Sequence, residues 1–129
     1  MPGVKKSAEK MQKTFAVIYI LTVILARLAA WFLTIYNAKH FSGFWHHLYT
    51  GLIILFTVLI FKGLLSKKLS VILLAIAAAL IADELFLVPV SLFAQVDPVE
   101  KYWSYYSWLG MFFLSLLILK ARRGIIKYI

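Results

Sequence analysis

The stretch from residue 45 to residue 88 decides the fold of this chain, and it reads WHHLYTGLIILFTVLIFKGLLSKKLSVILLAIAAALIADELFLV. It contains two apolar runs, residues 45–61 and 69–88, and a short lysine-containing segment between them. Each run is close to the roughly 20 apolar residues that an α-helix needs to cross about 30 Å of hydrocarbon. The stretch therefore predicts two transmembrane helices joined by a tight turn.

Two further apolar runs flank this pair, residues 14–36 before it and residues 103–119 after it. The hydrophobic fraction of 64% exceeds the roughly 45–50% of soluble domains. Short connections between successive spans favour antiparallel neighbours. We therefore expect residues 1–129 to form a single all-α transmembrane domain, an antiparallel four-helix bundle. In it, Pro89 kinks or ends the third helix and Asp97 caps the fourth ahead of Pro98.

The positive charges of the chain are distributed unevenly. Eleven of the 14 Lys and Arg residues lie in three segments that would share one face of a membrane, and the opposite loops contain only Lys39 and Lys101. Because cytoplasmic loops are enriched in Lys and Arg, this pattern predicts a multi-pass protein of the cell membrane with both termini in the cytoplasm. Aromatic residues at the outer ends of the runs, Trp103 and Trp108 among them, predict an interfacial aromatic belt. The net charge of +9 is thus explained by topology, so we expect membrane lipids and no nucleic acid as partners.

Ionisable side chains interrupt the apolar runs at five places: Arg27, His46, His47, Asp83 and Glu84. With a rise of 1.5 Å per residue, Arg27 lies about 20 Å from the lysine-rich end of its helix, Glu84 about 22 Å and His47 about 26 Å. Tyr105 and Tyr106 come out at a similar height on the fourth helix. The sequence therefore predicts one polar layer in the outer half of the bilayer, and such groups in a membrane are usually functional.

Two imidazoles and two carboxylates are a suitable ligand set for a divalent metal such as zinc, iron or manganese. We predict His46, His47, Asp83 and Glu84 as ligands, with Asp83 or Glu84 also available as a catalytic general base. Binding of a substrate is assigned to Arg27, which would hold a carboxylate or an anionic head group, and to three hydrogen-bond donors, Tyr49, Tyr105 and Tyr106. There is no cysteine, which excludes thiolate ligands and disulfides.

The same residues also have a simpler explanation. Arg27 with Asp83 or Glu84 would be a buried ion pair that fixes helix packing, and the histidines would lie hydrated at the interface. Asp83 and Glu84 are about 100° apart on a helix, so we expect them to reach different neighbours unless the helix is distorted. A stripe of small residues predicts close helix approach: Ala75, Ala78, Ala79 and Ala82. Gly51, one turn after His47, would admit a bulky neighbour or a ligand.

The elements His46-His47-x-x-x-Gly51 and Ala82-Asp83-Glu84 resemble a pattern in uncharacterised small four-span membrane proteins of archaea and bacteria. The resemblance covers about 40 residues, and it implies a polar site without a defined chemistry. Small multidrug transporters resemble this chain in size only, because their hallmark is a Glu in the first helix, where this chain has Arg27.

Three functions remain open from the sequence. The first is a membrane protein with a metal-binding polar site that acts on a lipid or another apolar substrate. The second is a structural or accessory subunit of a larger membrane complex, in which the charges organise helix packing. The third is a transporter or channel for a small solute or ion, which would need a homo-oligomer because four helices enclose little lumen.

Overall fold

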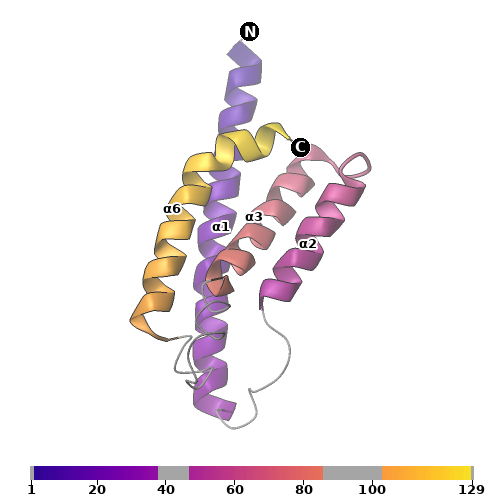
Figure 1. The fold of residues 1–129 in the computed structure, drawn as a ribbon. Coiled ribbons are helices and arrows are strands. Elements are labelled where there is room, and N and C mark those ends of the chain that lie inside the picture. Colours follow the sequence, from indigo (N-terminus) through magenta and orange to yellow (C-terminus); the bar gives the residue numbers. More distant parts are fainter. Residues whose placement is uncertain (1, 38–46, 86–102, 129) are drawn as a thin grey trace.

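The computed structural model of the chain describes residues 2–37, 47–85 and 103–128, and within these ranges the structure is helical with short turns and no strand. The helices are α1 (Pro2–Asn37), α2 (His47–Phe61), α3 (Lys67–Glu84) and α6 (Tyr105–Lys127) (Figure 1). The all-α prediction is therefore confirmed for the described ranges. Their order and spacing follow the four apolar runs of the sequence.

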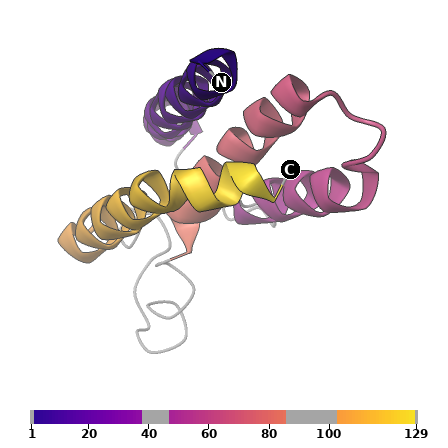
Figure 2. The same ribbon diagram turned by 90° about the horizontal axis from the view of Figure 1, so that it is seen from above.

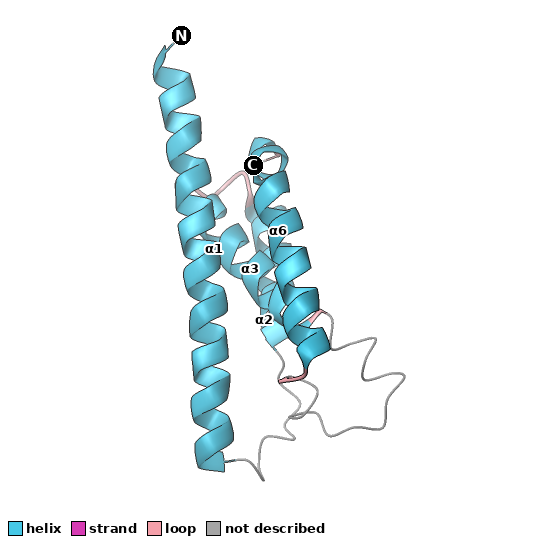
Figure 3. Cartoon of the chain, turned by 90° about the vertical axis from the view of Figure 1, so that its left-hand side faces the viewer, coloured by secondary structure: helices cyan, strands magenta, loops and turns pink. Residues whose placement is uncertain are grey.

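The helices differ from the apolar runs mainly in length. α1 begins at Pro2 rather than at residue 14, and α6 continues to Lys127 rather than ending at residue 119. Both extensions are rich in Lys, Glu, Gln, Arg and Ala, which are good helix formers although most of them are polar. Hydropathy alone therefore underestimates these two helices. As a result, the N-terminal turns of α1 extend beyond the ends of the other helices (Figures 1 and 3).

Serine side chains cap two of the helices. Ser66 accepts a hydrogen bond from the backbone N–H of Leu69 at the start of α3, and Ser104 accepts one from Ser107 at the start of α6. Helix α6 is therefore capped by Ser104. The predicted kink or end of the third helix at Pro89 lies outside the described residues, as does the predicted cap at Asp97, ahead of Pro98.

Helix α3 lies at the centre of the arrangement and packs against α2, α1 and α6, while α1 also packs against α6 (Figures 1 and 2). Small side chains allow this central position. Ala75, Ala79 and Ala82 are fully buried and share a core with large residues of α1, among them Phe15 and Tyr19. Three of the four alanines of the predicted stripe thus lie in the core, and the fourth, Ala78, packs against it half-buried.

A second close approach joins α2 to α3. A Cβ atom built on Gly51 would lie 2.8 Å from Cγ1 of Ile81 and 2.9 Å from the carbonyl oxygen of Ala77. Gly51 thus admits a bulky neighbour, as predicted, and that neighbour is Ile81 of α3. The absence of a side chain at Gly51 is what allows the two backbones to approach so closely.

Large apolar side chains cover much of the outer surface of the helices. The most exposed on α1, α2 and α6 include Leu25, Ile60 and Leu117. One segment, Lys6–Phe32 in α1, is long and apolar enough to cross a membrane, and α2 is a shorter apolar helix. Length and composition therefore give one candidate membrane span within the described residues.

Candidate functional site

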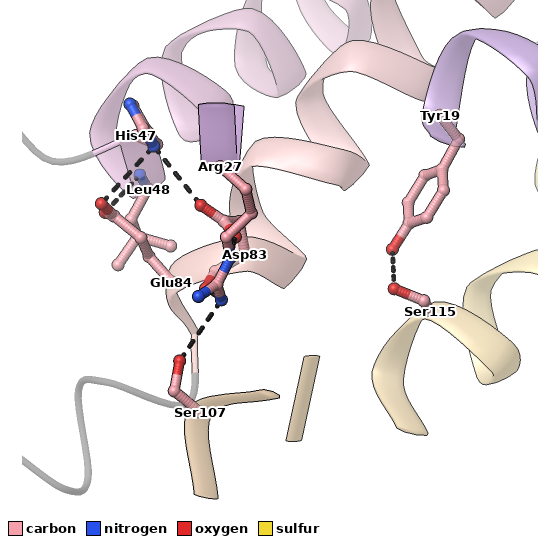
Figure 4. A network of polar contacts seen from close by, with 8 residues as sticks. All are labelled: Tyr19, Arg27, His47, Leu48, Asp83, Glu84, Ser107 and Ser115. Carbon is pink, nitrogen blue, oxygen red and sulfur yellow. Dashed lines mark hydrogen bonds and ion pairs between the residues drawn. The ribbon is translucent and has the colours of Figure 1, made fainter. Parts of the chain in front are cut away.

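Polar side chains from all four helices meet where α3 finishes and α2 and α6 begin (Figure 4). The members of this polar network are Arg27 of α1, His47 of α2, Asp83 and Glu84 of α3, and Ser107 of α6. Four of these five residues belong to the polar layer predicted from helix depth. All of them except His47 are buried.

Arg27 and Asp83 form the centre of the polar network. The guanidinium Nε donates to Oδ1 of Asp83 at 2.5 Å, and both side chains are almost completely excluded from solvent, at 6% and 0% exposure. Nη2 donates to the backbone carbonyl of Asp83 and to the hydroxyl of Ser107, both at 3.3 Å. Such a pair, held by additional hydrogen bonds, is the arrangement that compensates for the desolvation of two buried charges.

Aromatic rings of the α6 segment complete the surroundings of Arg27. The guanidinium carbon lies 4.6 Å from the ring centroid of Trp108 and 5.9 Å from that of Trp103. Both distances fall within the range of a cation–π interaction. Trp103 and Trp108 were predicted as part of an aromatic belt, so the sequence did not reveal that they contact the arginine.

His47 lies beside both carboxylates. Its Nδ1 is 3.4 Å from Oδ2 of Asp83 and 3.7 Å from Oε1 of Glu84. Its second ring nitrogen, Nε2, points away from them (Figure 4). The His47 side chain is 31% exposed, so this is the accessible member of the polar network.

Glu84 has a second role at the start of α2. Its Oε2 accepts a hydrogen bond of 3.0 Å from the backbone N–H of Leu48, in the first turn of α2. The first N–H groups of a helix have no partner within the helix and carry a partial positive charge. Glu84 therefore caps α2 from the neighbouring helix, which fixes the position of His47 relative to α3.

The expectation that Asp83 and Glu84 reach different neighbours was wrong, because both approach His47. The helix is not distorted there, since the N–H of Leu85 still donates to the carbonyl of Ile81 at 2.8 Å. The start of α2 lies beside the end of α3. The imidazole of His47 is therefore placed between the carboxylates of Asp83 and Glu84, which leave α3 in different directions. A histidine at the first position of a neighbouring helix can therefore contact both.

The role of the three tyrosines in substrate binding stays a prediction, and the structure gives their exposure. Tyr105 and Tyr106 are 73% and 74% exposed and contact each other edge to face, with ring centroids 6.4 Å apart. Tyr49 is about half exposed. The contribution of α6 to the polar network is Ser107 instead. The depth of Ser107 could have indicated this contact, because Ser107 directly follows Tyr106, which was placed in the polar layer. Serine is common in membrane helices, however, and Ser107 was not predicted as a site residue.

The predicted metal site is not supported by the residues that the structure places. In the described ranges no group of three or more His, Asp and Glu side chains is arranged to hold a metal ion. Asp83 uses Oδ1 for Arg27, and Glu84 uses Oε2 for the amide of Leu48. His46, the remaining predicted ligand, lies outside the described residues. Binding of zinc, iron or manganese therefore stays a prediction.

A separate polar contact joins α1 to α6 nearer the middle of the bundle. The hydroxyl groups of Tyr19 and Ser115 lie 2.8 Å apart, and Tyr19 is fully buried (Figure 4). Neither residue was predicted from the sequence to form this contact. The contact satisfies two hydroxyl groups that would otherwise be left in an apolar environment, so it has a clear structural role.

Comparison with known proteins gives no match: no protein-family model, no curated protein and no solved structure is significantly similar to this chain. The resemblance between the His46–Gly51 and Ala82–Glu84 elements and small membrane proteins stays a prediction. The geometry of the polar network is therefore the basis for the function proposed below.

Proposed function

We propose that this chain is an integral membrane protein whose four helices each cross the bilayer, with both termini in the cytoplasm. The exposed apolar side chains of α1, α2 and α6 support this placement, because soluble monomers rarely expose such extensive apolar surface. At 1.5 Å per residue, the 18 residues of α3 span about 27 Å and the 23 residues of α6 about 35 Å. Helix α2, with 15 residues, spans about 22 Å and would need its flanking residues to cross.

Within this placement, we propose that the polar network is an acid–base site that acts on a lipid or another amphiphile in the outer half of the bilayer. One observation carries the proposal: Nδ1 of His47 faces the carboxylate of Asp83, and the opposite nitrogen of this partly exposed ring points away. A carboxylate at Nδ1 favours the tautomer with its proton on that nitrogen. Nε2 is then the atom that accepts a proton from a hydroxyl group or a water molecule.

The other residues of the network have positioning roles in this proposal. Arg27 holds Asp83 in place, and Glu84 holds the first turn of α2. Glu84 also lies close enough to His47 to stabilise the imidazolium that forms when Nε2 takes up a proton. The predicted catalytic residues, Asp83 and Glu84, would thus act through His47 rather than on the substrate directly.

A comparison of lipid composition tests the acid–base site. Membranes of cells that express wild type, His47→Gln or Thr57→Val at equal levels are analysed by mass spectrometry. Thr57 is a suitable control because it lies on the same helix, is exposed, and donates its hydroxyl to the carbonyl of Ile53 in that helix, outside the polar network. We expect wild type and Thr57→Val to change the same lipid class and His47→Gln to leave it unchanged. A lipid change that persists in His47→Gln would exclude His47 as the base.

The metal content of the purified protein tests the predicted cofactor in the same samples. Stoichiometric zinc, iron or manganese in wild type, and its loss in His47→Gln, would support a metal-assisted reaction at this site. Its absence from wild type would leave the acid–base site without a metal and would reject the ligand set of His46, His47, Asp83 and Glu84.

A structural or accessory role is the second candidate, and the burial of the Arg27–Asp83 pair favours it. The contacts of Arg27 with Asp83 and with Ser107 join α1, α3 and α6. In this role they would stabilise helix packing and have no part in a reaction. Gentle solubilisation followed by native gel electrophoresis and identification of co-purifying chains separates the two candidates. A stoichiometric membrane partner, together with no lipid change in any variant, would favour the accessory subunit.

A further inference from the structure

We propose that the end of the bundle opposite the polar network binds the head groups of anionic phospholipids. The binding surface, which we name the basic collar, consists of cations from α1, from the α2–α3 turn and its flanks, and from the end of α6: Lys13, Lys62, Lys67, Lys68, Lys120, Arg122, Arg123 and Lys127. This inference rests on the membrane placement proposed above, and it assigns a specific lipid chemistry to a surface that the acid–base site does not use.

The end of α6 brings these three segments together. Its last turns run across the end of the bundle towards the α2–α3 turn, as both views of the ribbon show (Figures 1 and 2). Ile126 is buried in the core that contains Phe15 and Val71, so the end of α6 is anchored. Arg123 also donates from Nε to the side-chain oxygen of Gln12 on α1, at 3.3 Å. The cations of the basic collar therefore share one end of the molecule.

The charge of the basic collar is almost uncompensated. Seven of its eight residues are exposed, and Arg122 is half-buried. Among residues 2–37, 47–85 and 103–128, Glu9 is the one acidic residue at this end, because Asp83 and Glu84 belong to the polar network at the other. Such a concentration of positive charge attracts an anionic surface, and each Lys or Arg close to an anionic membrane contributes about 1 kcal/mol, or about 5-fold in affinity.

Exposed apolar side chains lie in the same turns as these cations. Leu64 and Tyr128 are 83% and 86% exposed, and Leu69 is 42% exposed. A phospholipid bilayer offers both an anionic head group and an apolar layer at this level, whereas a nucleic acid offers only the first. The mixture of cations with exposed apolar residues therefore favours lipid over a soluble polyanion.

Arg122 is the cation of the basic collar that is held against its own helix. Its Nη1 donates to the carbonyl of Leu119. A guanidinium that is already held in position loses little side-chain freedom when it binds, and its planar donors match the oxygens of a phosphodiester. We therefore expect Arg122 and its neighbour Arg123 to contribute most to head-group binding.

The full-length protein in detergent is the material for the test. Phosphatidylglycerol and phosphatidylcholine are added in equal amounts, and the retained lipids are counted by native mass spectrometry over a titration. We expect preferential retention of phosphatidylglycerol by wild type. R122Q/R123Q should weaken it by up to about 25-fold, since each cation contributes about 5-fold. K5Q/K6Q, which removes the same charge from the first two turns of α1, should weaken it by less than about 5-fold.

Several results would overturn the proposal. These are equal retention of both lipids by wild type, an equal loss in K5Q/K6Q, and complete displacement of phosphatidylglycerol by a short oligonucleotide, which would indicate a general polyanion surface. If R122Q/R123Q aggregates on gel filtration, K120Q/K127Q replaces it, because both lysines are exposed. Extraction of the chain from vesicles by alkaline carbonate would refute the membrane placement itself. A carbonate-resistant chain without lipid preference refutes only the basic collar.

Discussion

Substitution of Gly51 by Ala gives a direct test of the contact between α2 and α3. The new Cβ atom would lie 2.8 Å from Cγ1 of Ile81, 2.9 Å from the carbonyl oxygen of Ala77 and 3.1 Å from the backbone nitrogen of Ile81. Carbon atoms in contact prefer about 3.5–4.0 Å. Two of these three neighbours are backbone atoms, which cannot rotate away. Helix α2 must therefore move away from α3.

The magnitude follows from two opposing effects. Overpacking of a close contact costs about 1–3 kcal/mol, whereas replacing Gly by Ala within a helix stabilises it by about 0.5–1 kcal/mol. Gly124→Ala is the matched control, because Gly124 also lies in a helix and a Cβ atom added to it would meet nothing within 4 Å. It should give only the second effect. We expect Gly51→Ala to be less stable than Gly124→Ala by about 1–3 kcal/mol.

Reversible unfolding in mixed dodecyl maltoside and dodecyl sulfate micelles, followed by far-ultraviolet circular dichroism, measures this difference. Because His47 lies one turn before Gly51, the same substitution should also move the imidazole away from Asp83 and Glu84. Nitrogen NMR of labelled histidine detects this change, and the chain has three histidines. Equal stability of Gly51→Ala and Gly124→Ala, with an unchanged His47 spectrum, would refute the proposed close approach of the two helices.

Other contacts lead to further predictions in the same unfolding assay. Arg27→Met should destabilise the protein by about 3–5 kcal/mol, because it leaves Asp83 buried without its charge partner. R27M/D83L should recover most of that loss, and a double variant no more stable than Arg27→Met would contradict the ion pair. Tyr19→Phe should cost about 0.5–1.5 kcal/mol through the lost contact with Ser115, and the cost should vanish in a Ser115→Ala background. Glu84→Gln should cost about 0.3–1 kcal/mol by weakening the interaction with the start of α2, and a neutral result would argue against that cap.

The helices could be predicted from the sequence because each apolar run is long enough to indicate a helix by its length and hydropathy alone. Their ends could not, since residues such as Lys5 and Arg122 continue a helix for reasons of propensity and not of hydropathy. The central position of α3 could be predicted only in part from the sequence. The alanine stripe indicated close packing, but the sequence did not show that Ala77 and Ile81 pack against α2 on a second face.

The level of each site residue along its helix could be predicted from the sequence, but its contacts could not. A constant rise per residue was enough to predict that Arg27, His47 and the two carboxylates lie at one level. Which side chains contact each other depends on how each helix is rotated and how closely the helices approach. Neither property can be calculated from the position of a residue along its own helix. For this reason the contacts of Arg27 with Ser107 and Trp108, and of Glu84 with the amide of Leu48, emerged only from the structure.

The polar network divides into a closed half and an open half, and this division bears on its function. Arg27 and Asp83 are buried and face each other, so their charges compensate within the bundle. His47 is partly exposed and uses one nitrogen for the carboxylates. Packing accounts for the contact between Nδ1 and the buried carboxylates, but it does not require the imidazole to be accessible. The exposure of His47 beside two buried carboxylates is therefore the feature that favours an acid–base site over a purely structural ion pair.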